Sequence, residues 1–203
     1  MEVASGETAS ARTELPARAE DQDLPPQDLP SIREVYDDAL GTMGLRLTRS
    51  TLVDTTDGRY EPSSQGRHLA LYVEPLAERD LAAYVEDLWT LSALMTPDVF
   101  ERWPALESYD ICQEPVPSVD DSAEPPPVTQ LNLTRAAAES IDWEGGHLAD
   151  LLVAWRTDPD VALVVGRDLR RTALFQEADA IARERTSSSG SGPSSSGTPT
   201  YPS

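Results

Sequence analysis

The sequence contains no lysine, although it is 203 residues long. Its 16 basic residues are all arginines and stand against 36 aspartates and glutamates, which gives a formal net charge of −20. A chain this negative repels phosphate backbones and anionic lipid headgroups, which argues against nucleic-acid binding. Cationic partners, metal ions and a high-salt setting are compatible with the charge. Its simplest role is to keep the chain dissolved.

Cysteine and long apolar runs are also scarce. Cys112 is the single cysteine, so no disulfide can form within the chain and cysteine usage indicates no particular compartment. No apolar run approaches the roughly 18 residues that suggest a membrane span. The first residues lack the basic and apolar regions of a secretory signal. The sequence as it stands predicts a soluble, cytoplasmic protein, and a misassigned start codon would make it extracytoplasmic.

The local motifs of the common enzyme families are missing. A phosphate-binding loop that ends in Lys-Ser/Thr is excluded because there is no lysine. Gly-x-Gly-x-x-Gly after a strand, His-Glu-x-x-His, Gly-x-Ser-x-Gly and Cys-x-x-Cys are absent as well. We therefore expect no cofactor. Enzymes whose residues converge only in space stay possible.

Composition divides the chain into a domain with two tails. Residues 1–30 are acidic and proline-rich without apolar periodicity, and residues 186–203 are rich in Ser, Gly and Pro and carry no charge. Such segments cannot bury enough apolar surface to offset the entropy of ordering, so we predict that both are disordered. The folded part is then a single domain over residues 31–185.

Hydrophobic periodicity predicts the elements of this domain. Ser31 and Glu34 form a capping box at the start of a first helix, which Gly41 and Gly44 end. Thr96 and Pro97 are expected to start a separate short helix. Further helices are expected over 78–95, after Thr134, over 147–155 and over 168–185. The expected strands are 45–53, 67–74, 109–114, 128–133 and 161–165.

The order of these elements indicates the fold class. Residues 45–74 suit a hairpin, and the chain lacks the regular strand–helix alternation of a doubly wound sheet. We predict an α+β domain with a mixed or antiparallel sheet of about five strands and helices packed mainly on one face. The apolar segment 161–165 is expected at the centre of the sheet.

His68 and His147 are the only side chains whose ordinary pKa lies near neutrality. His68 is expected on the wet face of a strand. His147 stands at a helix start with Asp150 one turn on. A nucleophilic site would combine Cys112 with a histidine and an acid. The simpler alternative is a buried structural thiol and two surface imidazoles.

Other candidate sites are weaker. A zinc site would need ligands from Cys112, the histidines and carboxylates, and the spacing offers no local pair, so we predict no metal. Residues 54–61 are acidic around Gly58, but a hairpin turn suits them better than a calcium loop.

Trp103 and Trp155 occupy core positions. Trp89 and Trp143 are less clearly placed, and a loop near His147 is where a cleft is expected first.

Three hypotheses about function follow. The first is a non-enzymatic binding or protein-interaction domain, which its flexible N-terminus could tether to the cell envelope, with a protein as its partner. The second is a hydrolase-like enzyme that uses His147 and Asp150 with Cys112 or a carboxylate, which requires these groups within hydrogen-bond reach. The third is an acidic inhibitor that mimics nucleic-acid charge, which requires one continuous stripe of carboxylates.

Overall fold

The computed structural model describes residues 15, 23–26, 28–54, 61–63, 65–116 and 127–189. Its strands are β1 (Leu45–Asp54), β2 (Glu61–Pro62), β3 (His68–Pro75), β4 (Ser108–Gln113), β5 (Thr129–Thr134) and β6 (Val161–Val165). Its helices are α1 (Leu29–Thr42), α2 (Leu81–Arg102), α3 (Arg135–Glu139), α4 (Leu148–Thr157) and α5 (Ala173–Ser189), with a short 3₁₀ turn at Leu169–Arg171.

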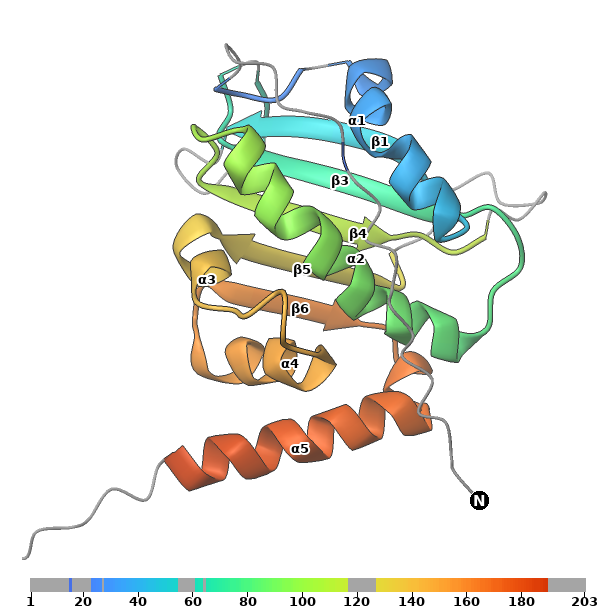
Figure 1. The fold of residues 1–203 in the computed structure, drawn as a ribbon, viewed down its shortest axis with the longest axis vertical. Coiled ribbons are helices and arrows are strands. Elements are labelled where there is room, and N and C mark those ends of the chain that lie inside the picture. The colour runs from blue at the N-terminus through green and yellow to red at the C-terminus, as the bar shows by residue number, and fades with distance from the viewer. Residues whose placement is uncertain are drawn as a thin grey trace, which may run out of the picture.

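The strands form one mixed sheet in the order β2-β1-β3-β4-β5-β6, in which β2 has only two residues. Figure 1 shows the long strands β1, β3, β4, β5 and β6 side by side in this order. β1 and β3 pair antiparallel, as the predicted hairpin requires. β3 and β4 are parallel, and α2 provides the crossover that a parallel pair needs. β5 and β6 add antiparallel strands on the far side. This confirms the predicted α+β class.

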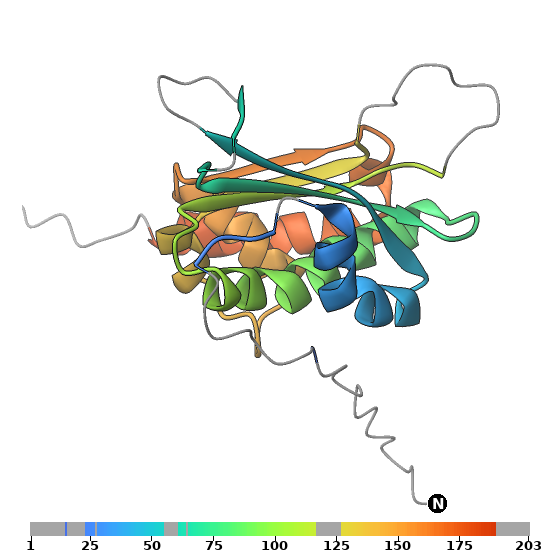
Figure 2. The same ribbon diagram turned by 90° about the horizontal axis from the view of Figure 1, so that it is seen from above.

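All the described helices lie on one face of the sheet (Figure 2). The core between the two layers contains alternate residues of the strands, among them Leu71, Ile111 and Leu131, and the inner faces of the helices. No described helix covers the opposite face. Side chains that alternate with the core residues therefore form an open surface on that side of the sheet.

The start of α1 differs from the prediction. The helix begins at Leu29, and Asp28 is its N-cap because its Oδ1 accepts hydrogen bonds from Ser31 N (3.0 Å) and Ser31 Oγ (2.8 Å). Ser31 is thus inside the first turn, and the capping box with Glu34 was wrong. Pro30 fits there because the first turn of a helix needs no proline N–H. Gly44, at a φ of 70°, makes the turn into β1.

α2 runs without a break through Pro97, so the prediction of a separate helix at Thr96 was wrong. Leu91, Met95 and Val99 continue one buried stripe across the proline. The burial of this stripe holds the helix together despite the missing hydrogen bond. At the other end, Leu81 was expected in the stripe but is 47% exposed.

β6 was predicted at the centre of the sheet but is the last strand at one edge. Its burial alternates, because Val161, Leu163 and Val165 face the helices while Ala162 and Val164 are exposed on the open face. α5 also begins later than predicted, after the 3₁₀ turn. Its buried residues are Phe175, Ala178 and Ala182, whereas Leu174 and Ile181 are only partly buried.

Arginines cap carbonyl groups at both long edges of the sheet. Arg33 of α1 donates from Nε to Leu47 O at 2.8 Å, and Arg170 donates from Nε to Val165 O at 2.9 Å. Unpaired edge carbonyls would otherwise invite another strand. Each contact occupies one carbonyl group of an outer long strand, Leu47 O in β1 and Val165 O in β6.

Two further predictions concern the limits of the domain. None of the described helices is both long enough and apolar enough to cross a bilayer. Most of residues 1–30 and residues 190–203 lie outside the described residues, so the division into one domain and two disordered tails stays a prediction. Within the first segment, Ala105 N donates to Asp23 O at 3.0 Å and Leu24 packs against the core. The predicted turn at residues 55–60 also lies outside the description.

Candidate functional site

The open face of the sheet is hollowed near its centre. Strand register aligns Thr51, Ala70, Asp110 and Asn132 in one row across β1, β3, β4 and β5. The hollow has a volume of about 400 Å³. Its lining consists of Arg49, Thr51, Val53, His68, Ala70, Tyr72, Asp110, Gln130 and Asn132. Most of these side chains are polar, in contrast to the leucines and valines with which they alternate along the strands.

Asp110 is the acid in this lining, and only 7% of its surface is exposed. Its Oδ2 accepts a hydrogen bond from Gln130 Nε2 at 3.0 Å and lies 3.4 Å from His68 Nε2. Its Oδ1 is buried and has no hydrogen-bond partner among the described residues. A buried carboxylate oxygen in this state costs free energy, because water no longer solvates it.

His68 was predicted on the wet face of its strand. The face is the open one, as predicted, but the residue is only 2% exposed, and its ring contacts the side chains of Ser108 and Asp110 in β4. His68 Nδ1 lies 2.9 Å from Ser108 Oγ. A carboxylate can only accept hydrogen bonds, which favours the neutral imidazole with its hydrogen on Nε2, pointing towards Asp110. In that form Nδ1 accepts a hydrogen bond from the Ser108 hydroxyl.

The histidine ring thus lies between a serine and an acid, Ser108 and Asp110, as in a hydrolytic triad. The 3.4 Å separation of His68 and Asp110 is longer than an ordinary hydrogen bond. Ser108 also does not belong to the lining of the hollow. A molecule in the hollow meets Asp110, Gln130 and Asn132 instead of the serine hydroxyl, so this geometry favours binding over nucleophilic attack.

Arg49 is the other charged residue of the lining, and an acid outside the hollow compensates its charge. Its guanidinium carbon lies 3.7 Å from the centre of the Tyr72 ring, and its Nη2 lies 3.5 Å from Glu114 Oε1. Thr48 Oγ1 donates to Glu114 Oε2 at 2.7 Å and holds that carboxylate in place. Because Arg49 and Glu114 cancel, Asp110 dominates the formal charge of the hollow.

Cys112 lies on the same face as the hollow but is completely buried between Tyr72 and Gln130 in the strand register. Burial raises the pKa of its thiol to about 12, and Asp110 and Glu114 act in the same direction. A thiol with this pKa is almost entirely protonated at neutral pH. It is therefore not an activated nucleophile.

His147 and Asp150 are close together, as the hydrolase hypothesis requires, with His147 Nδ1 2.5 Å from Asp150 Oδ2. Asp150 Oδ2 also accepts from His147 N at 2.9 Å, and its Oδ1 pairs with Arg185 Nη1 at 2.5 Å. These contacts form the N-terminal cap of α4 and tie it to α5. The His147 side chain is 55% exposed in the helix layer, across the sheet from Cys112, so the structure does not bring the two together.

The region around His147 contains the two less clearly placed tryptophans. Trp89 and Trp143 stack on each other, with their ring centres 5.5 Å apart. A depression of about 510 Å³ lies beside α4 and the end of α5 and includes Asp142, Asp150, Asp158 and Arg185. Neither tryptophan lines it. Trp103 is fully buried as predicted, whereas Trp155 is only partly buried.

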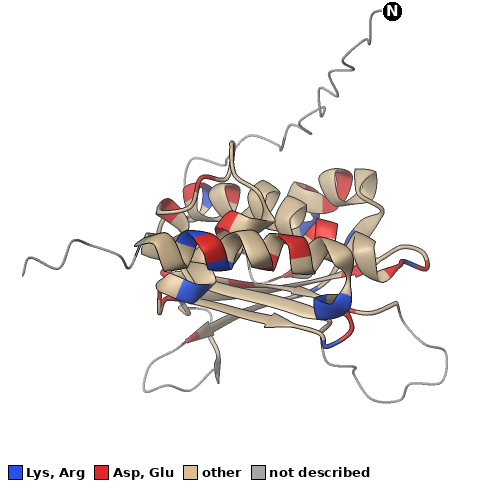
Figure 3. Ribbon diagram, turned by 90° about the horizontal axis from the view of Figure 1, so that it is seen from below, with Lys and Arg blue, Asp and Glu red and all other residues tan. Residues whose placement is uncertain are grey.

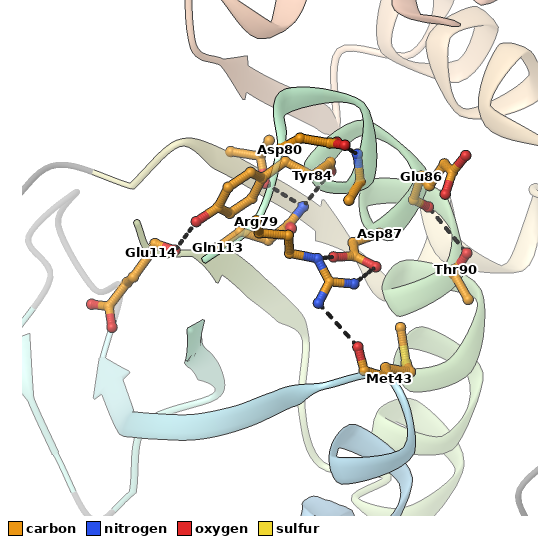
Figure 4. Close-up of polar contacts among 11 residues, drawn as sticks. Met43, Arg79, Asp80, Tyr84, Glu86, Asp87, Thr90, Gln113 and Glu114 are labelled. Atoms are coloured by element: carbon orange, nitrogen blue, oxygen red, sulfur yellow. Dashed lines mark hydrogen bonds and ion pairs between the residues drawn. The ribbon is translucent and has the colours of Figure 1, made fainter. Parts of the chain in front are cut away.

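Asp87 is the carboxylate with the most perturbed pKa among the described residues (Figure 4). Arg79 Nη2 donates to Asp87 Oδ1 at 2.8 Å, Arg79 Nε lies 2.7 Å from Oδ2, and Arg79 Nη1 donates to Met43 O at 3.0 Å. Burial nevertheless raises the pKa of Asp87 to about 6, against the opposing effect of Arg79. Because this pair joins α2 to the end of α1 without lining a hollow, we interpret it as structural.

Many carboxylates of the helix layer are paired with arginines, as Asp98 is with Arg102 and Asp179 with Arg156 and Arg183. In Figure 3 the acidic positions lie on several helices and alternate with arginines. This arrangement gives no support to one continuous stripe of carboxylates. The nucleic-acid mimic stays a prediction.

Within the described residues, no group of three or more His, Cys, Asp or Glu side chains is placed to bind a metal ion. Comparison with protein-family models, with curated proteins and with solved structures gave no match to this chain.

Sequence analysis found His68 but missed Asp110, Gln130 and Asn132, which complete the hollow. The available signal was the alternation in residues 109–114 and 128–133. Asp110 stands there between Tyr109 and Ile111, and Gln130 and Asn132 flank Leu131. Gln113 and Thr129 interrupt the alternation. This pattern predicts a polar face for each strand, but the register that brings Asp110 beside Gln130 and His68 depends on pairing between distant segments.

Proposed function

We propose that this chain is a binding domain, without catalytic activity of its own, that holds a group of its partner in the hollow on the open face of the sheet. The observation that carries the proposal is the buried Asp110 carboxylate, whose Oδ1 has no hydrogen-bond partner among the described residues. Buried polar atoms in folded proteins are nearly always satisfied, and exceptions commonly mark functional sites. Asp110 lines the hollow, so a donor group bound there would compensate the charge of this carboxylate.

The rest of the lining supports the same function. Gln130, Asn132 and Thr51 are partly exposed and offer hydrogen-bonding groups around Asp110. Together with Asp110 they stand on three strands of one sheet, and such rigid elements hold a binding site more precisely than loops do. Ligand sites commonly combine a concave surface with a few convergent polar groups.

The enzyme alternative has less support. It requires an activated nucleophile, whereas Cys112 is buried with a raised pKa and Ser108 stands outside the lining of the hollow. His147 and Asp150 are close together, but their contacts cap a helix. A binding domain needs none of these groups to react.

Nuclear magnetic resonance can test the proposal on the full chain. The two histidines give two sets of ring signals, one inside the hollow and one in the helix layer. We would add the N-acetyl methylamides of the natural amino acids in pools, as mimics of side chains on a partner. The proposal predicts saturable shifts of the His68 ring and of the Gln130 and Asn132 side-chain amides, with His147 unchanged. If every pool leaves these three side chains unperturbed at millimolar concentration, the proposal is wrong.

A further inference from the structure

The formal charges around the hollow define the class of ligand. Asp110 accepts a side-chain hydrogen bond from the neutral amide of Gln130, and His68 Nε2 lies 3.4 Å from the same carboxylate oxygen. Arg49 is paired with Glu114 and lies against the Tyr72 ring. The hollow therefore carries about one uncompensated negative charge, in a chain whose net charge is also negative.

The orientation of Gln130 adds a second acceptor. Because a carboxylate accepts but cannot donate, the Gln130 nitrogen must face Asp110, which leaves its Oε1 on the other side of the amide as an acceptor. Asn132 lies beside Asp110 in the strand register and lines the same hollow. The side-chain amide of Asn132 makes no hydrogen bond to a described residue, so its oxygen can accept one from a ligand.

From this arrangement we propose that the hollow binds a guanidinium group, and that its natural occupant is an arginine side chain of a partner protein. This inference rests on the proposed function and names the ligand for that site. A guanidinium carries five N–H donors in a planar fork, which suits acceptors spread over two neighbouring strands. An ammonium offers a compact point charge and is more strongly hydrated, so it loses more solvation on entering a site this buried.

The test uses the full chain and four matched compounds, the N-acetyl methylamides of arginine, citrulline, lysine and glutamate. Citrulline has nearly the shape of arginine without its charge. We expect the arginine compound to shift the His68 ring saturably, and its dissociation constant to be about tenfold or more below that of the citrulline compound, in line with the strength of hydrogen bonds to charged groups. Lysine should bind less tightly than arginine, and glutamate should not bind. Methylguanidinium should bind more weakly than the arginine compound, which separates a side chain from a free cation.

Two variants examine the role of the carboxylate. Asp110→Asn should reduce the affinity for the arginine compound to that for citrulline. Asn132→Asp, at a partly exposed position, should increase the affinity by adding a second carboxylate. The second variant keeps the test decisive if the first fails to fold. An unchanged affinity in Asn132→Asp would count against the assignment.

The outcomes separate the two proposals. Equal binding of the arginine and citrulline compounds, or of arginine and lysine, would overturn the guanidinium assignment while the hollow remained a binding site. Equal shifts at His68 and His147 would mean general attraction to an acidic chain and would also overturn it. Failure of all compounds, including the wider pools, to perturb the hollow would overturn the proposed function itself.

Discussion

Gln130 Nε2 donates a 3.0 Å hydrogen bond to Asp110 Oδ2, while Asp110 Oδ1 is buried without a hydrogen-bond partner among the described residues. Both residues line the hollow on the open sheet face. The two residues stand diagonally on adjacent antiparallel strands. Their contact fixes the direction of the carboxylate and also turns the Gln130 carbonyl oxygen away from it. The proposed site follows from this single relationship.

If Asp110 serves binding rather than stability, Asp110→Asn should not destabilise the domain. The substitution removes a buried charge that is only partly satisfied, and an asparagine carbonyl can still accept from Gln130. We expect the free energy of unfolding in urea to stay within about 1 kcal/mol of the wild type or to rise. A loss of several kcal/mol would show that the carboxylate mainly supports the fold.

Asp87 should make stability depend on pH. Its folded-state pKa of about 6 exceeds the ordinary value of 3.8, because burial disfavours the charged form. Its contribution to stability is therefore complete below about pH 3.8 and is lost as the pH rises to about 6. The loss amounts to at most about 3 kcal/mol.

The measurement is urea unfolding between pH 4 and 7 for the wild type and for Asp87→Asn. General repulsion among the carboxylates also grows over this range, but it affects both proteins alike. The variant should therefore show a shallower fall in the free energy of unfolding. Parallel pH profiles for the two proteins would contradict a raised pKa at Asp87.

Cys112 should react slowly with iodoacetamide in the native protein. A thiol pKa of about 12 leaves about 1,000-fold less thiolate than the ordinary value of 9.0, and burial also blocks access. Mass spectrometry should find rapid labelling only after unfolding in urea. Fast native labelling with a pH midpoint near neutrality would instead revive the nucleophile hypothesis.

Asp150 should matter more for stability than His147. Asp150→Ala removes the hydrogen bond to His147 N and the ion pair with Arg185, so we expect a loss of about 1 kcal/mol, the usual effect of a lost helix cap. His147→Ala removes only one exposed side-chain contact and should cost less. Thermal unfolding of both variants measures the difference, and the reverse order would mean that the imidazole, rather than the carboxylate, holds the helix start.

Ser108 should not react with a fluorophosphonate probe, although it contacts His68. The serine does not line the hollow, and the adjacent His68 is only 2% exposed. Intact-mass analysis after incubation should show an unmodified chain. A Ser108 adduct that disappears in His68→Ala would establish the enzyme alternative.

Sequence periodicity predicted most of the elements because amphipathic patterns are local. The α+β class, the hairpin of β1 and β3 and the helix layer on one face followed from it. Errors arose where distant contacts decide the outcome. Pro97 does not end α2 because the core continues beneath it, and β6 is apolar yet lies at the sheet edge.

Less of the candidate site than of the fold could be predicted from the sequence. His147 and Asp150 stand out in the sequence because they are close along the chain, and the structure gives them a capping role. Asp110 contacts Gln130, which is 20 residues away along the chain, and His68 in β3, which is 42 residues away (110 − 68). Only the pairing of β3, β4 and β5 reveals them.

The most direct test of the account is to locate a bound guanidinium by intermolecular nuclear Overhauser effects. The N-acetyl methylamide of arginine would be added to the full chain in which only the histidine and tyrosine rings carry protons. The account predicts contacts between the side-chain methylene protons of the compound and the rings of His68 and Tyr72, with none to His147. Contacts to His147 alone, or none to either ring under saturating conditions, would contradict it.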